Sequence, residues 1–435
     1  MESLFKVREN GSTFWTEVLA GVTTFVTMSY IIFVNPGILS KTGMDFNALV
    51  VATCLASALG TFLMAVLANY PIALAPGMGL NAFFAFGVVL SMKIGGAPVT
   101  WQMALAAIAV EGLIFVVLTL TSLREMIVNT IPKSLKIGIS AGIGLFITFI
   151  GLQGAGIVVN DEATLLALGS LKGNTPALLA LFGLILMAVL TAWNVKGALL
   201  IGILAVTGIA AAMGLVTVPE TFISQPPSIQ PLLCQFDFSL IGKLEFWVVV
   251  FSFFFVDFFD TVGTLVGVCN RSGLLNEDGT LPRAKGALMA DALATVAGAA
   301  MGTSTVTSYV ESSSGVAQGG RTGLTSIVTA LLFVGAIFFT PIVGMVPGYA
   351  TAPALILVGF YMMMSLRDLN YDDWTEFFPS LLGFFMMPLT YSISIGIEFA
   401  IVSYVLIKSF SGKFRDVSGL MTALAMIFII KELFA

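Results

Sequence analysis

Apolar stretches long enough to cross a lipid bilayer follow one another along nearly the whole chain. A helix needs about 20 consecutive apolar residues to span roughly 30 Å of hydrocarbon. Of the 435 residues, 58% are hydrophobic and only 10% are charged, whereas a soluble domain carries about a quarter of its residues as charged groups. No polar interruption is long enough to hold a separate soluble domain. The sequence therefore predicts an all-α polytopic membrane protein.

The apolar pattern predicts two successive sets of spans, with boundaries read from hydrophobicity alone. The first set covers residues 14–34, 47–68, 72–91, 101–121, 134–159, 176–193 and 197–217. The second set covers residues 244–268, 285–301, 303–318, 323–343, 347–365, 376–391 and 392–409. A further apolar stretch, 418–434, follows with its topology undecided. The amino terminus lacks a signal-peptide pattern, so the first span is expected to be retained.

The positions of lysine and arginine support fourteen crossings with a cytoplasmic amino terminus. When the spans alternate from an inner amino terminus, 14 basic residues fall inside and 4 fall outside, with Lys431 unassigned. The four outer residues are Lys41, Lys93, Lys172 and Lys243. Cytoplasmic loops are enriched in Lys and Arg. We therefore expect a multi-pass protein of the cytoplasmic membrane.

Weak similarity between the two sets indicates an inverted repeat. IPKSLKIGISAGIGLFI at the fifth span resembles VPGYATAPALILVGFYM at the twelfth, and TAWNVKGALLIGILAV resembles TYSISIGIEFAIVSYV. Because each set has an odd number of spans, the second set lies upside down relative to the first. Inverted repeats typically place a substrate site near the bilayer midplane, on broken helices. Chance resemblance between apolar helices is the alternative.

The third and tenth spans are interrupted at corresponding places. Pro71, Pro76, Gly77 and Gly79 fall in the first half of YPIALAPGMGLNAFFAFGVVL, and GTSTVTSYVESSSGVAQGG is rich in Thr and Ser. Proline removes a backbone donor and β-branched Thr favours extended structure. Each span is therefore predicted to start as a short extended piece followed by a half-helix. Such backbone is tolerated at membrane depth only when it is buried in protein or lines a cavity.

Ionisable side chains inside spans are costly, which makes each one a functional candidate. Asp257 and Asp260 lie three residues apart in FSFFFVDFFDTVGTLVGV and therefore share one helical face. Glu311 follows the extended part of the tenth span, and Asn81 occupies the matching place in the third. The inverted repeat would bring the two half-helix starts together against the eighth span.

Structural explanations compete with each of these functional ones. A neighbouring hydroxyl or backbone group could satisfy each candidate carboxylate, and Asn81 could cap its half-helix. Helix packing or interfacial placement explains three further apolar-flanked carboxylates more simply: Glu111, Asp291 and Glu398. The phenylalanines within residues 251–259 are expected to pack or to face lipid. The chain contains no His, so proton transfer near neutral pH would have to use carboxylates.

Several long motifs resemble those of the purine-base permeases of the nucleobase–cation symporter-2 family, specifically its AzgA-like branch. They are TFVTMSYIIFVNPGIL in span one, APGMGLNAFFAF in span three, VDFFDTVGTLVGV in span eight, GTSTVTSYVESSSGVAQGGRTGLTS in spans ten and eleven, and VPGYATAPALILVG in span twelve. The motifs occur in the order typical of the branch. The resemblance covers essentially the whole chain.

This resemblance implies a 7+7 inverted-repeat transporter with a core domain and a gate domain. The core would comprise residues 1–130 and 241–345, which hold spans one to four and eight to eleven. The gate would comprise residues 131–240 and 346–417, and residues 418–435 lie beyond both repeats. A homodimer joined through the gate and contact with membrane lipid are also implied. A nucleic-acid partner is not expected.

The resemblance also assigns roles to the polar residues of the broken spans. The positions that bind substrate or line its site correspond here to Asn81, Ala82, Asp257, Glu311 and Ser312. Asp260 matches a second acidic residue that is important for transport. Either Asp260 or Glu311 is expected to take the coupling proton, so H⁺ is the expected coupling ion and no other cofactor or metal is expected.

A purine base offers N–H donors and acceptor atoms along a planar edge, which carboxylates and an Asn amide can pair. The pattern VDFFDT resembles that of guanine–hypoxanthine permeases, whereas adenine-selective relatives have Asn in place of the first Asp. A carboxylate at Asp257 suits the N–H-rich edge of a 6-oxopurine. Hypoxanthine and guanine are therefore the expected substrates, with adenine as the alternative.

The expected activity is proton-coupled uptake of the base by an elevator-type movement of the core. Na⁺ in place of H⁺ stays open. A channel or receptor that binds purines without coupled transport is a further alternative, and so is a sulfate or bicarbonate carrier of similar architecture. An enzyme is not expected, because the sequence has no His, no metal-ligand cluster and no nucleophile–base pair.

Overall fold

The protein is described by a computed structural model that covers residues 5–94, 96–121, 132–272, 274 and 281–434 (backbone only at 259, 262–263, 266, 270–272 and 431–434). The chain divides into two compact units. The first contains residues 1–120 and 151–354, and the second contains residues 121–150 and 355–435. The expected division into a core and a gate, at the boundaries given above, stays a prediction.

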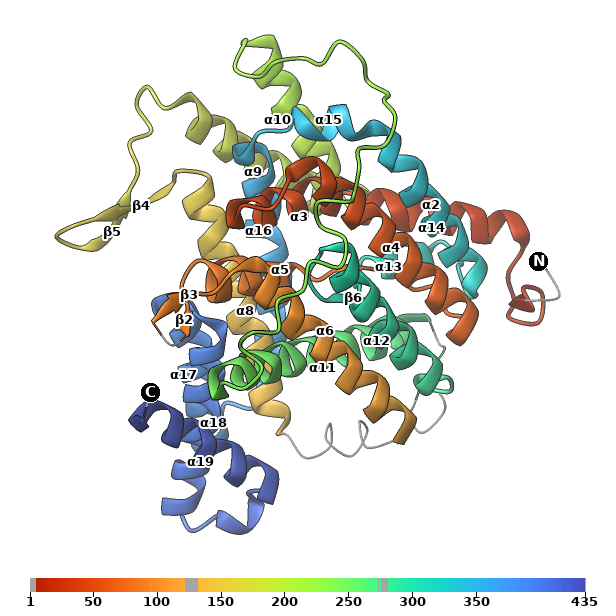
Figure 1. Cartoon of the computed structure of the whole chain (residues 1–435). Coiled ribbons are helices and arrows are strands. Elements are labelled where there is room, and N and C mark those ends of the chain that lie inside the picture. The colour runs from red at the N-terminus through yellow and green to blue at the C-terminus, as the bar shows by residue number, and fades with distance from the viewer. Residues whose placement is uncertain (1–4, 95, 122–131, 273, 275–280, 435) are drawn as a thin grey trace. The chain divides into compact units, whose positions relative to one another are not determined.

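Helices make up most of the first unit, with three short pairs of strands between them (Figure 1). Its helices are α2 (Phe14–Met28), α3 (Ile31–Leu39), η1 (Ser40–Thr42), α4 (Phe46–Ala68), α5 (Met78–Ala82), the π-helix η2 (Phe83–Val89), α6 (Trp101–Thr121), α9 (Thr175–Ala192), α10 (Ala198–Ala212), α11 (Leu244–Ser272), α12 (Ala284–Met301), α13 (Ser312–Ala317), α14 (Gly323–Ala336), η3 (Ile337–Phe339) and α15 (Thr340–Gly344). Its strands are β1 (Leu74–Pro76), β2 (Lys93–Ile94), β3 (Ala97–Pro98), β4 (Val158–Asp161), β5 (Leu165–Leu168) and β6 (Val306–Ser308).

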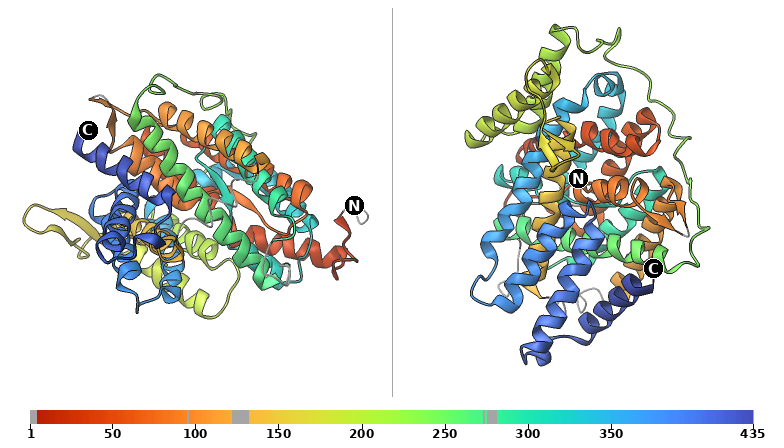
Figure 2. Two further views of the ribbon diagram at one scale, coloured as in Figure 1. Left: turned by 90° about the horizontal axis from the view of Figure 1, so that it is seen from below. Right: turned by 90° about the vertical axis from the view of Figure 1, so that its left-hand side faces the viewer.

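The second unit consists of helices among its described residues. They are most of α8 (Lys133–Gly154), the last part of α16 (Gly348–Met363), η4 (Met364–Asp368), α17 (Trp374–Leu389), α18 (Ile393–Phe410), η5 (Phe414–Asp416) and α19 (Gly419–Phe434). Figure 2 shows that α19, the dark blue helix at the carboxyl end, is steeply inclined to α17 and α18. The buried residues of α19 recur with helical spacing, which is the pattern of a helix that packs along one face.

Eight helical segments of the described residues are long and apolar enough to cross a membrane. They are Phe14–Thr42, Phe46–Ala68, Trp101–Thr121, Lys133–Gly154, Thr175–Ala192, Gly323–Gly344, Gly348–Asp368 and Ile393–Phe410. Three shorter apolar helices, Met78–Val89, Ala198–Ala212 and Gly419–Ile430, fall within other predicted spans or the carboxyl-terminal stretch. A multi-pass membrane protein follows from these helices.

The end of the fifth predicted span is wrong. Residues 134–159 were expected to form one helix, but α8 ends at Gly154 and β4 begins at Val158, pairing with β5 as a hairpin. Gly156, with φ +68°, turns the chain between the two, a conformation that glycine adopts without steric cost. Val158 and Val159, which begin β4, continue the apolar run of α8 in the sequence, and hydrophobicity does not distinguish the start of a strand from the end of a helix.

The third and tenth predicted spans start as extended chain, as expected, and the two extended pieces pair. Strands β1 and β6 are antiparallel, with Ala75 opposite Thr307 at the centre. Just outside the strands, the Gly77 N–H donates to the Thr305 carbonyl at 2.9 Å, and the Tyr309 N–H donates to the Ala73 carbonyl at 3.0 Å. These two bonds exchange under a twofold rotation about the central pair, which is the local symmetry that an inverted repeat produces.

Two threonines seal the outer edges of this two-stranded sheet. Hydrogen-bonded pairs alternate along antiparallel strands, so Leu74 and Val306 direct their backbone groups away from the partner strand. The Thr61 hydroxyl, from α4, bonds both the N–H and the carbonyl of Leu74, at 2.9 and 3.1 Å. The Thr295 hydroxyl, from α12, does the same for Val306, at 3.3 and 3.0 Å. Sheet edges inside a membrane need such partners because water is absent.

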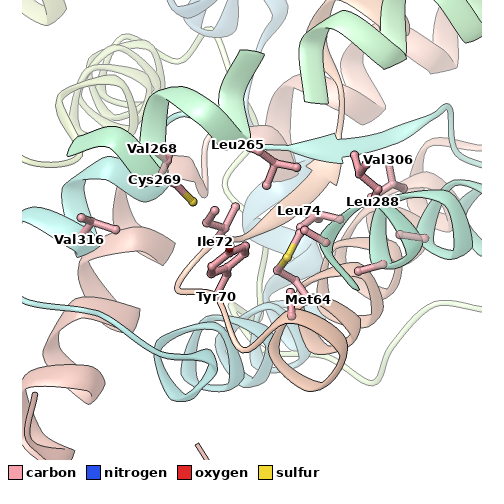
Figure 3. Packing of buried hydrophobic residues seen from close by; sticks show 14 of the residues in the cluster. Met64, Tyr70, Ile72, Leu74, Leu265, Val268, Cys269, Leu288, Val306 and Val316 are labelled. Carbon is pink, nitrogen blue, oxygen red and sulfur yellow. The ribbon is translucent and has the colours of Figure 1, made fainter. Parts of the chain in front are cut away.

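Apolar side chains from α4, α11, α12, α13 and both strands close over the sheet (Figure 3). Leu74 of β1 and Val306 of β6 are fully buried in this cluster, together with Met64, Tyr70 and Leu265. Gly60 allows α4 to approach α12 closely, because a Cβ there would lie 3.0 Å from the Ala294 Cβ. The packing therefore holds β1 and β6 in one position within the first unit; the point where the two strands pair is called the strand crossing.

Candidate functional site

Around the strand crossing of β1 and β6 lie two short helices, α5 and α13, together with α11. Strand β1 leads into α5, which carries Asn81, and β6 leads to Glu311 at the start of α13. Helix α11, which carries Asp257 and Asp260, packs against β6, α5 and α13. The structure thus brings the polar residues of spans three, eight and ten together, from positions that are far apart in sequence.

Asn81 is fully buried, and only one of the two polar atoms of its side-chain amide is hydrogen-bonded among the described residues. Its side-chain oxygen accepts a hydrogen bond from the Ser304 hydroxyl, which belongs to the segment between α12 and β6. Its side-chain nitrogen has no hydrogen-bond partner among the residues that the structure describes. The capping explanation for Asn81 is wrong, because Gly77 is the N-cap of α5 and Asn81 lies inside the helix.

Glu311 is positioned by the first span. The Tyr30 hydroxyl, at the break between α2 and α3, donates to Glu311 Oε1 at 2.6 Å. The Thr27 hydroxyl lies 3.5 Å from the backbone carbonyl of Glu311. Sequence reasoning missed Tyr30, although a hydroxyl inside the apolar run TFVTMSYIIFVNPGIL is a signal that could have identified it. Tyr30 and Glu311 are too far apart in sequence for any local pattern to pair them.

Asp257 lies at one end of a buried network of hydroxyls and carboxylates. The Thr261 hydroxyl, one turn further along α11, is 3.5 Å from Asp257 Oδ1, 2.6 Å from Asp291 Oδ1 and 2.8 Å from the Thr307 hydroxyl. All four residues are fully or almost fully buried. A hydroxyl has one proton to donate, so Thr261 donates best to Asp291, its nearest acceptor, while Thr307 can donate to Thr261.

Asp260 is partly exposed and faces two other carboxylates. It lies within electrostatic range of both Asp291 and Glu311. Asp291 was expected to be a packing residue of α12, yet it belongs to this cluster through Thr261 and Asp260. Three carboxylates from α11, α12 and the start of α13 therefore interact across the site, and neutralising one of them changes the field at the others.

Ala82 and Ser312 differ in what they can contribute. Ala82 ends α5, is almost fully buried and presents only a methyl group. The Ser312 hydroxyl accepts a hydrogen bond from the Ala73 N–H at 3.0 Å, so it supports the chain that enters β1. Its proton stays available for a second bond. Both residues lie beside the strand crossing, and their contact with a substrate stays a prediction.

The other residues weighed in the sequence have structural partners. Glu111 is fully buried in α6, and the Thr305 hydroxyl lies 3.5 Å from it. Glu398 is in α18 of the second unit and pairs with Ser394 at 3.2 Å. Phe254 and Phe258 stack with each other and with Phe115 of α6. The aromatic run of α11 therefore packs between helices, as the structural explanation expected.

The polar side chains near β1 and β6 offer both hydrogen-bond donors and acceptors. It combines an amide N–H₂ donor at Asn81 with carboxylate acceptors at Asp257 and Glu311. Acceptor-only carboxylates require N–H or O–H donors on a ligand, and the amide donor requires an acceptor. Within the described residues, no three His, Cys, Asp or Glu side chains are grouped so that they could hold a metal ion.

Comparison with known proteins places this chain among permeases. Residues 16–399 match the sequence model Xan_ur_permease, described as the Permease family. A putative permease of Methanocaldococcus jannaschii is 48% identical and the match covers 99% of this chain and 98% of that protein. The adenine permease AdeP of Escherichia coli is 44% identical, covering 100% and 96%. The guanine/hypoxanthine permease PbuO of Bacillus subtilis is 44% identical, covering 98% and 99%.

Among solved structures, the transmembrane domain of the cyanobacterial bicarbonate transporter BicA resembles this chain with a TM-score of 0.65. The match covers 88% of this chain and 97% of that one, at 14% sequence identity. Likeness at this identity concerns the fold alone. It confirms the predicted fold class, an all-α membrane protein with a 7+7 inverted repeat and short extended segments in the third and tenth spans.

Proposed function

This chain belongs to the Permease family of xanthine/uracil type, and we propose that it carries purine bases into the cell together with protons. Hypoxanthine and guanine are the proposed substrates. The observation that carries this proposal is the convergence of the Asn81 amide nitrogen with two carboxylates at the strand crossing. Members of the family with named substrates support a nucleobase and not another small polar solute.

The names of the relatives do not choose between purines. An adenine permease and a guanine/hypoxanthine permease are each 44% identical to this chain. The edges of the two kinds of base differ in chemistry. A 6-oxopurine has a carbonyl oxygen beside a ring N–H, whereas adenine has an amino group beside a bare ring nitrogen. The Asn81 donor matches the carbonyl of a 6-oxopurine, and the Asp257 acceptor matches its ring N–H. On adenine the Asn81 donor would meet the amino donor, and the Asp257 acceptor would meet the bare ring nitrogen, which is also an acceptor.

In the proposed cycle, a proton neutralises one carboxylate of the cluster when the base binds. Asp260 and Glu311 are the proposed carriers of that proton, since they lie within electrostatic range of each other. Charge is costly in a low-dielectric path, so the loaded, neutralised core would move more easily than the empty, charged one. An elevator-type movement against the gate would then release base and proton on the cytoplasmic side. A homodimer with a cytoplasmic amino terminus in the cytoplasmic membrane is part of the same proposal.

Uptake of labelled hypoxanthine into energised membrane vesicles tests this function. We expect uptake to fall when the proton gradient is collapsed and to be competed by guanine. Asp257→Asn should weaken hypoxanthine binding by about 10–100-fold, because a hydrogen bond to a charged group contributes about 1.5–3 kcal/mol. Asp257→Glu keeps the charge, and Glu220→Gln changes an exposed loop residue as a matched control. Unchanged affinity in Asp257→Asn would contradict the site.

Exchange experiments separate this proposal from its alternatives. In proteoliposomes, a carrier exchanges internal unlabelled base for external labelled base, and a channel does not. A receptor would bind hypoxanthine without accumulating it. A sulfate or bicarbonate carrier would show uptake that guanine leaves unchanged. Preferential uptake of adenine over hypoxanthine would assign the chain to the other substrate group.

A further inference from the structure

Asn81 can hydrogen-bond as a donor or as an acceptor, and which it presents depends on how its amide is turned. The structure holds the amide by its oxygen. The Ser304 hydroxyl donates to Asn81 Oδ1, which leaves the N–H₂ group directed away from that contact and without a partner among the described residues. Both side chains are fully buried, so no bulk water competes for the amide. A buried donor without a partner is costly unless a ligand supplies an acceptor.

Ser304 itself is held in place by its two neighbours. The Thr303 hydroxyl, on one side, lies 3.0 Å from the Asn35 amide nitrogen of α3. On the other side, the backbone carbonyl of Thr305 accepts a hydrogen bond from the Gly77 N–H at the start of α5, at 2.9 Å. The segment between α12 and β6 is therefore tied to both α3 and the helix that carries Asn81. This places the Ser304 hydroxyl at a defined point beside the amide.

We propose that Ser304 is the positioning residue that sets substrate preference: it fixes the Asn81 amide so that a nitrogen donor meets the 6-position of the base. The inference rests on the proposed function. A 6-oxopurine offers a carbonyl oxygen to this donor, and adenine offers an amino group that cannot accept. Asp257 would bind the neighbouring ring N–H, and Ser304 acts on the base only through Asn81.

Wild-type competition measurements test the inference without any variant. Unlabelled hypoxanthine and unsubstituted purine, which lacks both the 6-oxygen and the ring N–H beside it, compete with labelled hypoxanthine for uptake. The loss of these two groups leaves both the Asn81 donor and the Asp257 acceptor unpaired, so hypoxanthine should compete better on the order of tenfold or more. Equal competition by the two bases would overturn the inference. Failure of both to compete, together with absent hypoxanthine uptake, would instead refute the proposed function.

Substitution of Ser304 then identifies its role. In Ser304→Ala the amide is free to turn and present its oxygen, so the preference for hypoxanthine over adenine should narrow by about tenfold. Ser304→Thr keeps a hydroxyl and should keep the wild-type ratio. A purely structural role would lower uptake of both bases and leave the ratio of their inhibition constants unchanged, and that result would overturn the assignment. The ratio is independent of how much protein reaches the membrane.

Discussion

Replacing Thr295 with valine removes one hydroxyl from α12 and keeps nearly the same side-chain shape. That hydroxyl bonds both the N–H and the carbonyl of Val306, on the outer edge of β6. Both Thr295 and Val306 are fully buried, so no water can take over the two bonds. A buried backbone group without a partner costs about 1–3 kcal/mol. The two groups together should lower stability by about 2–6 kcal/mol, a large share of the margin of a typical folded protein.

The same substitution can be made at the symmetry-related position. Thr61→Val removes the bonds to Leu74 on the outer edge of β1 and should cost a similar amount. The two hydroxyls bond different strand edges, but Leu74 and Val306 pack in the same buried cluster, so we expect their effects to be coupled in the double variant. Apparent melting temperatures of the purified protein in detergent provide the measurement.

Serine substitutions separate the hydroxyl from the methyl group. Thr295→Ser and Thr61→Ser keep the bonds to the strand edges and should melt close to the wild type. Thr221→Val, in an exposed loop, is the control for the substitution itself. If the valine variants have the same melting temperatures as their serine counterparts, the strand edges do not depend on these hydroxyls. The hydroxyl bonds to the strand edges would then not be what permits extended chain at membrane depth.

Three other predictions concern Glu17, Asp373 and helix α19. Glu17 is fully buried and accepts hydrogen bonds from backbone N–H groups at the start of α14 and from the Thr325 hydroxyl at 2.6 Å. Glu17→Gln replaces one acceptor oxygen with a donor and should lower the free energy of unfolding by about 2–4 kcal/mol. An unchanged melting temperature would contradict this. The Thr375 hydroxyl, first among several contacts, lowers the pKa of Asp373 to about 2, so its contribution to stability is present above about pH 4 and is lost as pH falls toward 2. The melting-temperature difference between wild type and Asp373→Asn should therefore shrink over that range, and a constant difference would argue against it. Helix α19 has 16 residues and is therefore about 24 Å long, shorter than the roughly 30 Å of a bilayer's hydrocarbon core. Accessibility tags placed after residue 412 and at the carboxyl terminus should therefore report the same side of the membrane. Tags on opposite sides would show that α19 crosses.

The candidate site illustrates how far sequence reasoning reaches. Asn81, Asp257 and Glu311 stand out because polar groups are rare within apolar spans, and the structure places all three around one strand crossing. Their roles in binding stay predictions. Asp291 did not stand out from other apolar-flanked carboxylates, since its importance arises from contact with Thr261 of another helix.

Hydrophobicity and backbone chemistry were enough to establish the membrane class and the two interrupted spans. Both are local properties: an apolar run must leave water wherever it folds, and Pro76 cannot donate to a helix whatever surrounds it. The turn at Gly156 and the β4–β5 hairpin were not recoverable, because hydrophobicity does not distinguish an apolar strand from a helix end.

Tertiary structure alone decided which polar groups meet. The Tyr30 hydroxyl finds Glu311 across 281 positions of sequence, and the Ser304 hydroxyl finds Asn81 across 223. No local pattern encodes such a pair, because each partner satisfies only the general requirement that a buried polar group needs a hydrogen bond. Pairing depends on how α2, α5 and the segment before β6 cross in three dimensions. The sequence by itself determined that this chain belongs in a membrane and that two of its spans are broken, and the fold determined which end of the Asn81 amide is hydrogen-bonded.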